Sequence, residues 1–341
     1  MNIMIFKQKI LGIVLLTAIC SCQSSKEVKT TGSIERVDPT LESIVSPDAT
    51  IEIIADGFDW TEGPLWIEDK KMLLFSDIPK NTVFKWTEEN GIETYLKPSG
   101  YTGVADGRGE PGSNGLLLDG QGNLVLCQHG DRRLARMASP LDTPRAEFVT
   151  IAATFDGKKI NSPNDATFHD GDFYFTDPPY GLAKGEADSL KETPFQGVYR
   201  VQANGQVTML IDSLTRPNGI AFSPDGSYLY VANSDKAKAR WYRYSVVKDD
   251  MGNVVLAAGK ILYDATSLTA TEKGLPDGMK VDNNGTIFAS GPGGIFIFNP
   301  EGKVLGKIKL AEAASNTALS GDQKILYITN DMNILRVKLR K

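Results

Sequence analysis

A short pattern recurs six times along this chain, and each copy opens with a polar residue followed by an apolar stretch, a tight turn and a second apolar stretch. The leading residues are Glu62, Asn114, Asn164, Asn218, Asp277 and Asn316. They lie 39 to 59 residues apart, close to the repeat of roughly 40–50 residues that is typical of a β-propeller. The sequence therefore predicts an all-β fold, a six-bladed β-propeller with four-stranded antiparallel blades.

The last repeat is one strand short, because only three apolar stretches follow its leader before the sequence stops. Residues 51–54, ahead of the first repeat, form an apolar stretch of the right length without a partner in their own repeat. We expect this N-terminal strand to pair with residues 334–339. The pairing would close the ring and cover two strand edges that would otherwise be exposed.

Composition places the chain among ordinary globular proteins and narrows its partners. Hydrophobic residues make up 41% and charged residues 23% of the 341 positions. The net charge is −5, without an arginine-rich stretch or a zinc-finger spacing, so we expect no nucleic-acid partner. The lone Cys127 lies in an apolar stretch and reads as a small buried hydrophobe.

The N-terminus has the features of a bacterial lipoprotein signal. Lys7 and Lys9 precede an apolar run over residues 10–19, which is too short to span a bilayer comfortably. Cys22 follows, with a small residue directly before it and an aliphatic residue three positions before it, which resembles a lipobox. A plain secretory signal or an uncleaved anchor is the alternative reading.

This reading divides the chain into three parts. Residues 1–22 are expected to be a lipoprotein-type signal peptide with lipidation at Cys22. Residues 23–47 are polar and poor in aromatic residues, so we expect a flexible tether, and residues 48–341 form the propeller. The expected location is the cell envelope of a bacterium, facing the periplasm or the exterior, with the membrane reached only through the lipid.

Four leading residues carry oxygen donors of the kind that hard metal ions prefer. Glu62 and Asp277 offer carboxylates, and Asn164 and Asn218 offer amides. Equivalent positions of propeller blades converge on one axis, so these side chains are expected to form a ring suited to Ca²⁺, Mg²⁺ or Mn²⁺. Asn or Asp before Gly is also common turn chemistry, and the recurrence in every repeat is what argues against that simpler reading.

Four segments resemble those of a known family. They are Glu62-Gly-Pro-Leu-Trp66, Ser162-Pro-Asn-Asp165 with Phe175-Thr-Asp-Pro-Pro-Tyr-Gly181, Arg216-Pro-Asn-Gly219 and Pro276-Asp-Gly-Met279. In order and spacing they resemble the gluconolactonase/luciferin-regenerating-enzyme family, which includes regucalcin, the senescence marker protein. The resemblance covers residues 50–341. It implies a six-bladed propeller with a divalent metal at the axis and hydrolysis of sugar lactones or related esters.

The resemblance also implies roles for individual residues. Glu62, Asn218 and Asp277 match the family's metal ligands, and Asn164 matches a position that contacts metal or substrate. Ca²⁺ is the expected ion, with Mg²⁺, Mn²⁺ or Zn²⁺ as alternatives. Ser162 stands where the animal branch of the family has Arg, so the substrate contacts of those enzymes do not carry over.

The expected reaction is attack of water on a sugar-lactone carbonyl that the metal polarises. Asp277 is the favoured general base, and Asn164 helps to orient the substrate. Asn114, at another ring position, and Tyr180 are expected to contact the substrate; Tyr180 could equally be core. Hydrolysis of phosphotriesters or other esters at the same site is an alternative, as is a non-catalytic propeller that binds calcium together with sugar or protein.

A Ser-His-Asp triad is not expected, since the sequence has only two histidines and no Gly-x-Ser-x-Gly segment. His169 falls in a predicted turn and is expected to be exposed. His129 follows the second strand of its blade, and we expect it to be a structural residue at the end away from the channel mouth.

Overall fold

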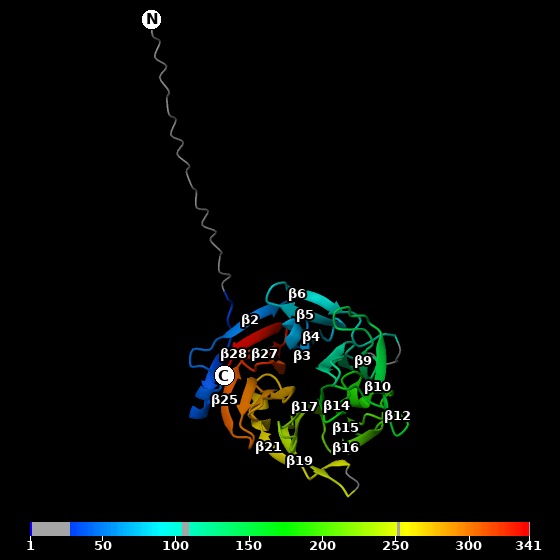
Figure 1. Ribbon diagram of the computed structural model, residues 1–341. Coiled ribbons are helices and arrows are strands. Elements are labelled where there is room, and N and C mark those ends of the chain that lie inside the picture. The colour runs from blue at the N-terminus through cyan, green and yellow to red at the C-terminus, as the bar shows by residue number, and fades with distance from the viewer. Residues whose placement is uncertain (2–27, 104–108, 251–252, 341) are drawn as a thin grey trace.

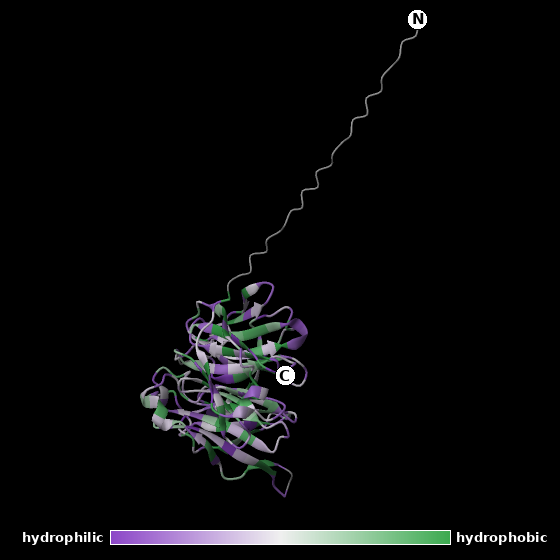
Figure 2. Cartoon of the chain, turned by 90° about the vertical axis from the view of Figure 1, so that its left-hand side faces the viewer, coloured by the Kyte–Doolittle hydropathy of each residue, from purple (hydrophilic) through white to green (hydrophobic). Residues whose placement is uncertain are grey.

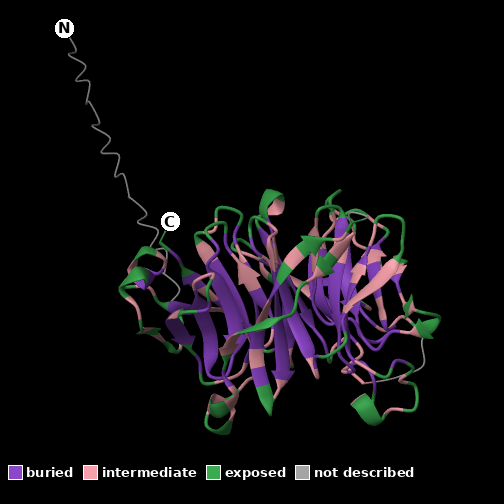
Figure 3. Cartoon of the chain, turned by 90° about the horizontal axis from the view of Figure 1, so that it is seen from below, coloured by how far each residue is buried: buried purple, intermediate pink, exposed green. Residues whose placement is uncertain are grey.

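The computed structural model describes Met1 and residues 28–103, 109–250 and 253–340. Six antiparallel sheets stand around a central axis like the blades of a propeller (Figure 1). Seen edge-on, buried strands occupy the middle of the disc and exposed turns lie on its two faces (Figure 3). The predicted six-bladed all-β fold is confirmed.

The first three blades follow chain order from the axis outward. Blade 1 holds β3 (Thr61–Ile67), β4 (Met72–Asp77), β5 (Thr82–Thr87) and β6 (Gly91–Leu96). Blade 2 holds β7 (Ser113–Leu118), β8 (Leu124–Gln128), β9 (Arg133–Met137) and β10 (Phe148–Ala152). Blade 3 holds β13 (Ala166–His169), β14 (Asp172–Asp177), β15 (Gly197–Val201) and β16 (Val207–Ile211), and the hairpin of β11 (Thr154–Phe155) and β12 (Lys158–Lys159) precedes it.

Blades 4 and 5 each have a fifth strand, and blade 6 takes its fourth strand from the N-terminal part of the chain. Blade 4 holds β17 (Pro217–Phe222), β18 (Tyr228–Asp235), β19 (Lys238–Lys248) and β21 (Lys260–Asp264), with β20 (Val254–Leu256) pairing the far end of β19. Blade 5 holds β22 (Met279–Val281), β23 (Ile287–Gly291), β24 (Gly294–Phe298) and β25 (Val304–Lys309), and β1 (Ser33–Arg36) is its fifth strand. Blade 6 holds β26 (Ala314–Leu319), β27 (Ile325–Asn330), β28 (Asn333–Lys338) and β2 (Ile51–Asp56).

The core lies between neighbouring blades, because each sheet buries both of its faces. Cys127 and Leu117 of blade 2, for example, pack in one cluster with Phe175 and Tyr199 of blade 3. Figure 2 shows hydrophobic and hydrophilic residues interspersed along the strands in view, and the molecule has no single hydrophobic face there. Cys127 is fully buried, which agrees with its reading as a small hydrophobe.

The N-terminal strand closes the ring as predicted. β2 pairs antiparallel with β28, from Ile51 opposite Val337 to Asp56 opposite Asn333. The pairing joins the two ends of the described propeller within one blade and covers the edge of β28 that β27 does not pair with. Thr61 of β3 also connects blade 1 to blade 6, since its hydroxyl donates to the carbonyl oxygen of Asp331 in the β27–β28 turn at 2.9 Å.

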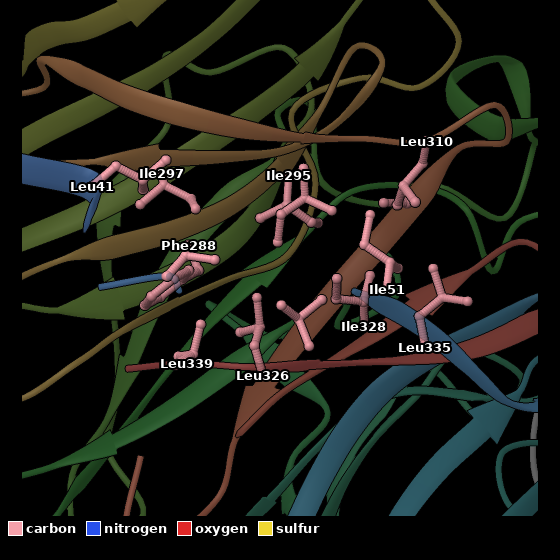
Figure 4. Close-up of a cluster of buried hydrophobic side chains, with 14 of the residues drawn as sticks. Leu41, Ile51, Phe288, Ile295, Ile297, Leu310, Leu326, Ile328, Leu335 and Leu339 are labelled. Atoms are coloured by element: carbon pink, nitrogen blue, oxygen red, sulfur yellow. The ribbon is translucent and has the colours of Figure 1, made fainter. Parts of the chain in front are cut away.

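The expectation of a flexible tether is wrong for much of residues 23–47. β1 pairs with β25 along its whole length, and the short 3₁₀ helix η1 (Pro39–Ser43) follows it. Leu41 and Val45 are fully buried in a cluster with residues of blades 5 and 6 (Figure 4). The prediction relied on the polar composition of the segment as a whole, but a few buried apolar residues are enough to dock it on the propeller. Cys22 lies outside the described residues.

Helical structure is confined to short 3₁₀ turns in the part of the chain that the structure describes. Besides η1 these are η2 (Glu68–Lys70), η3 (Gly185–Ala187) and η4 (Thr266–Ala270). None of the described helices has the length and apolar character needed to cross a membrane.

Candidate active site at the end of the central channel

Six inner strands surround the axis, and each contacts the inner strand of the next blade. The ring runs β3, β7, β13, β17, β22, β26 and back to β3. The leading residues all lie within two positions of the starts of these strands. The register between the inner strand and the second strand of a blade shifts next to several of these residues. Examples are the shifts between Glu62 and Leu65 and between Pro217 and Ile220. The regular alternation of side chains is thus interrupted where the leaders lie.

The glycines after the leaders allow the inner strands to approach one another. A Cβ atom on Gly63 would lie 2.1 Å from the carbonyl oxygen of Asn114, and one on Gly219 would lie 2.2 Å from that of Asp277. No side chain fits such a gap, so glycine is required by close packing of backbones. The Asn-Gly pair at residues 218–219 lies inside β17, which excludes the turn reading there.

A cavity of about 150 Å³ lies at the end of the channel where the leaders gather. Its lining residues are Trp60, Glu62, Ile78, Glu110, Asn114, Asn164, Tyr180, Asn218, Ser234 and Asp277. All six residues that the sequence nominated for metal or substrate are among them. A second pocket of about 360 Å³ shares Trp60, Ser234 and Asp277 with the cavity, which leaves room for a ligand to extend outward.

Four oxygen atoms in this cavity are buried without a hydrogen-bond partner. They are Oδ1 of Asn114, Asn164, Asn218 and Asp277. A buried polar atom left unpaired costs about 1–3 kcal/mol, and four buried acceptor oxygens in one place would suit a positively charged ligand. Carboxylate and amide oxygens fit a hard divalent cation. Among the described residues, no group of three or more His, Cys, Asp and Glu is placed to hold a metal ion.

The two carboxylates resist ionisation in this setting. Burial, together with the charges of Asp165 and Glu110, raises the pKa of Glu62 to about 8, against the hydrogen bond from the Gly63 amide. Burial and then the charge of Glu62 raise the pKa of Asp277 well above its usual range. A cation between the two would favour both ionised forms.

Glu62 is held in place by one of its two oxygens. Oε2 accepts from the Gly63 amide at 2.9 Å and from Nδ2 of Asn316 at 3.4 Å. Oε1 has no hydrogen bond within the described residues, so it is available to a ligand. Asn316, the sixth leader, thus supports Glu62 from outside the cavity lining.

Ser162 fixes the loops that carry Asn164 and Tyr180. Its buried hydroxyl donates to the carbonyl oxygen of Pro178 at 2.6 Å and accepts from the Gly181 amide at 2.8 Å. The two loops are therefore joined directly behind the cavity. Tyr180 is a cavity wall, and burial raises the pKa of its hydroxyl well above the usual range.

Sequence reasoning missed Trp60, Ile78, Glu110 and Ser234. Glu110 lies in a loop without an equivalent in the repeated pattern, so recurrence gave no signal for it. Ser234 lies in β18, a second strand that every blade has, but only the leading positions were considered. Trp60 lies two positions before Glu62, and that closeness could have nominated it.

The two histidines also differ from expectation. His129 is fully buried, yet its Nδ1 lies 2.8 Å from Oε2 of Glu110, a cavity residue. The second strand of a blade returns toward the channel mouth, so the expectation that His129 lies at the far end is wrong. His169 is half-buried and stacks on Phe222 with ring centroids 4.1 Å apart.

Comparisons with known proteins show the family and support the fold. Residues 60–331 match the family model described as the SMP-30/Gluconolactonase/LRE-like region. The chain is 37% identical to a gluconolactonase of Zymomonas mobilis, over 91% of this chain and 87% of the relative. It is 26% identical to a pentonolactonase of Haloferax volcanii, over 79% and 80%. A solved gluconolactonase of Xanthomonas campestris superposes with a TM-score of 0.76 at 26% identity, covering 92% of this chain and 99% of that one.

Proposed function

This chain belongs to the SMP-30/gluconolactonase/LRE-like family, and from that premise we propose that it is a lactone hydrolase that opens sugar lactones with the help of a divalent cation. The observation that carries the proposal is a set of three unpartnered buried amide oxygens beside two buried carboxylates in one cavity, and one of those carboxylates, Asp277, also has an unpartnered oxygen. The lactonase relatives support the substrate class.

The proposed cation ligands are Glu62, Asn164, Asn218 and Asp277. Together they supply carboxylate and amide oxygens only, and Ca²⁺ suits such a set, with Mg²⁺, Mn²⁺ or Zn²⁺ as alternatives. A divalent ion bound here would act as a Lewis acid toward the lactone carbonyl and favour the ionised carboxylates.

The chain's own residues have separate tasks in this account. Asp277 takes the proton from the attacking water, for which it must be ionised, and a cation bound beside it would favour that ionised form. Asn164 holds the lactone in line with that water, and Asn114 and Tyr180 contact its ring. Trp60 supplies a partly apolar wall that limits access of bulk water.

We further propose that Cys22 carries a lipid and holds the protein in a bacterial cell envelope. The motif before Cys22 supports this proposal. Cys22 and the motif before it lie outside the described residues, so the lipidation proposal is tested by experiment on the full chain.

The test of function is a panel of sugar lactones, phosphotriesters and simple esters, assayed with and without a chelator. We expect turnover of sugar lactones that the chelator removes and added Ca²⁺ restores. Preference for a phosphotriester would favour the alternative esterase function. Absence of turnover on the whole panel, in protein that binds Ca²⁺, would favour a non-catalytic propeller.

A further inference from the structure

Glu110 reaches the cavity from a loop outside the repeated pattern. The loop joins β6 to β7, and its backbone is fixed on the loop that carries Tyr180. The Gly109 amide donates to the Gly181 carbonyl oxygen, and the Glu110 amide donates to the Tyr180 carbonyl oxygen, both at 3.2 Å. Glu110 therefore has a set position at the cavity despite lying between two blades.

His129 holds the side chain of Glu110. Its Nδ1 lies 2.8 Å from Oε2 of Glu110, and since a carboxylate can only accept, Nδ1 is the donor. The imidazole is fully buried, and its Nε2 has no partner. Glu110 is thus the only hydrogen-bond partner of this ring within the described residues, which gives the pair one geometry.

Glu110 keeps one oxygen free for a ligand. Oε1 has no hydrogen bond among the described residues, and the Glu110 side chain is 43% exposed. The half-exposed side chain of Glu110 can meet an incoming molecule, whereas the buried oxygens of Asn164, Asn218 and Asp277 are those proposed for the cation.

We propose that Glu110 determines specificity for hydroxylated lactones by accepting hydrogen bonds from ring hydroxyl groups, with His129 as its positioning residue. The inference rests on the proposed lactonase function. A lactone without hydroxyl groups has no donor for this carboxylate, so it leaves the acceptor unpaired and is bound less well.

The test compares kcat/KM for δ-gluconolactone with kcat/KM for δ-valerolactone, using the full chain saturated with Ca²⁺. Glu110→Ala should lower the ratio at least about tenfold, mainly through KM for the hydroxylated lactone, since a hydrogen bond to a charged acceptor is lost. Glu301→Ala removes a carboxylate from the exposed β24–β25 turn and should leave the ratio unchanged.

His129 variants test the positioning role. His129→Leu removes the donor and should lower the ratio, while His129→Asn keeps an N–H near the position of Nδ1 and should restore most of it. If His129→Leu does not fold, the Asn variant against wild type decides: a ratio reduced as far as in Glu110→Ala contradicts positioning by His129.

The outcomes separate this inference from the proposed function. A wild-type protein inactive on both lactones would refute the function itself. An active protein whose ratio is unchanged by Glu110→Ala would refute the inference alone. Equal loss on both lactones together with weaker Ca²⁺ binding would place Glu110 among the cation ligands and also overturn the inference.

Discussion

The charge of Glu62 contributes to raising the pKa of Asp277, although the two residues begin different blades and lie far apart in the sequence. Burial is the larger cause, and both carboxylates line one cavity. Two acids in such a place are stable when protonated, or when a cation lies between them. This relationship links stability, pH and metal binding.

We expect cation-free protein to lose stability as the pH rises. Folded Glu62 keeps its proton up to its pKa of about 8, whereas the unfolded chain releases it near 4.5. The folded state binds more protons between these values, so the free energy of unfolding falls with rising pH across that window and levels off above it. Thermal melting with a chelator from pH 5 to 9 measures the decline.

Glu62→Gln should flatten much of this decline, and Glu301→Gln, in an exposed turn, should not. Added Ca²⁺ should oppose the decline in wild type, because the ion favours the ionised carboxylate. A melting temperature that stays constant over the window in chelated wild type would contradict the buried-carboxylate account.

Leu41→Ala should destabilise the protein by about 2–5 kcal/mol, the usual cost of truncating a fully buried leucine. Val37→Ala is the matched control, because Val37 lies in the same segment and is 57% exposed. Chemical denaturation compares the two. Equal, small effects would mean that the segment before β2 is not docked on blades 5 and 6.

Cys22→Ser should release the protein from membranes. If a lipid is attached at Cys22, wild-type protein made in a bacterium partitions into the detergent phase, and the variant remains in the aqueous phase or is not processed. Phase separation followed by immunoblotting reads this out. Wild-type protein that is wholly soluble would contradict lipidation.

Much of the fold could be predicted from the sequence because one pattern occurs six times. Repetition also located the inner strands, and a missing strand in the last repeat pointed to the closing role of β2. The docking of β1 on β25 could not be predicted in the same way. This strand pairing occurs in one blade and so is not part of the repeat. The segment is polar overall, so its composition gives no sign that Leu41 and Val45 are buried.

The part of the site that is built from equivalent positions of the blades could be predicted from the repeat. Glu62, Asn164, Asn218 and Asp277 meet because equivalent blade positions converge. Glu110 could not be found in this way, since its loop has no counterpart in other blades and its placement depends on tertiary contacts with Tyr180 and Gly181.

The proposed cation site and the role of Asp277 in hydrolysis are tested most directly by calorimetric Ca²⁺ titration. The titration is run beside lactonase kinetics on wild type, Asp277→Asn and Glu62→Gln. We expect weaker Ca²⁺ binding in both variants and an unchanged fold. Hydrolysis should be abolished in Asp277→Asn and partly recovered by excess Ca²⁺ in Glu62→Gln. Unchanged Ca²⁺ affinity in both variants would contradict the metal site, and retained turnover in Asp277→Asn would remove Asp277 from the reaction.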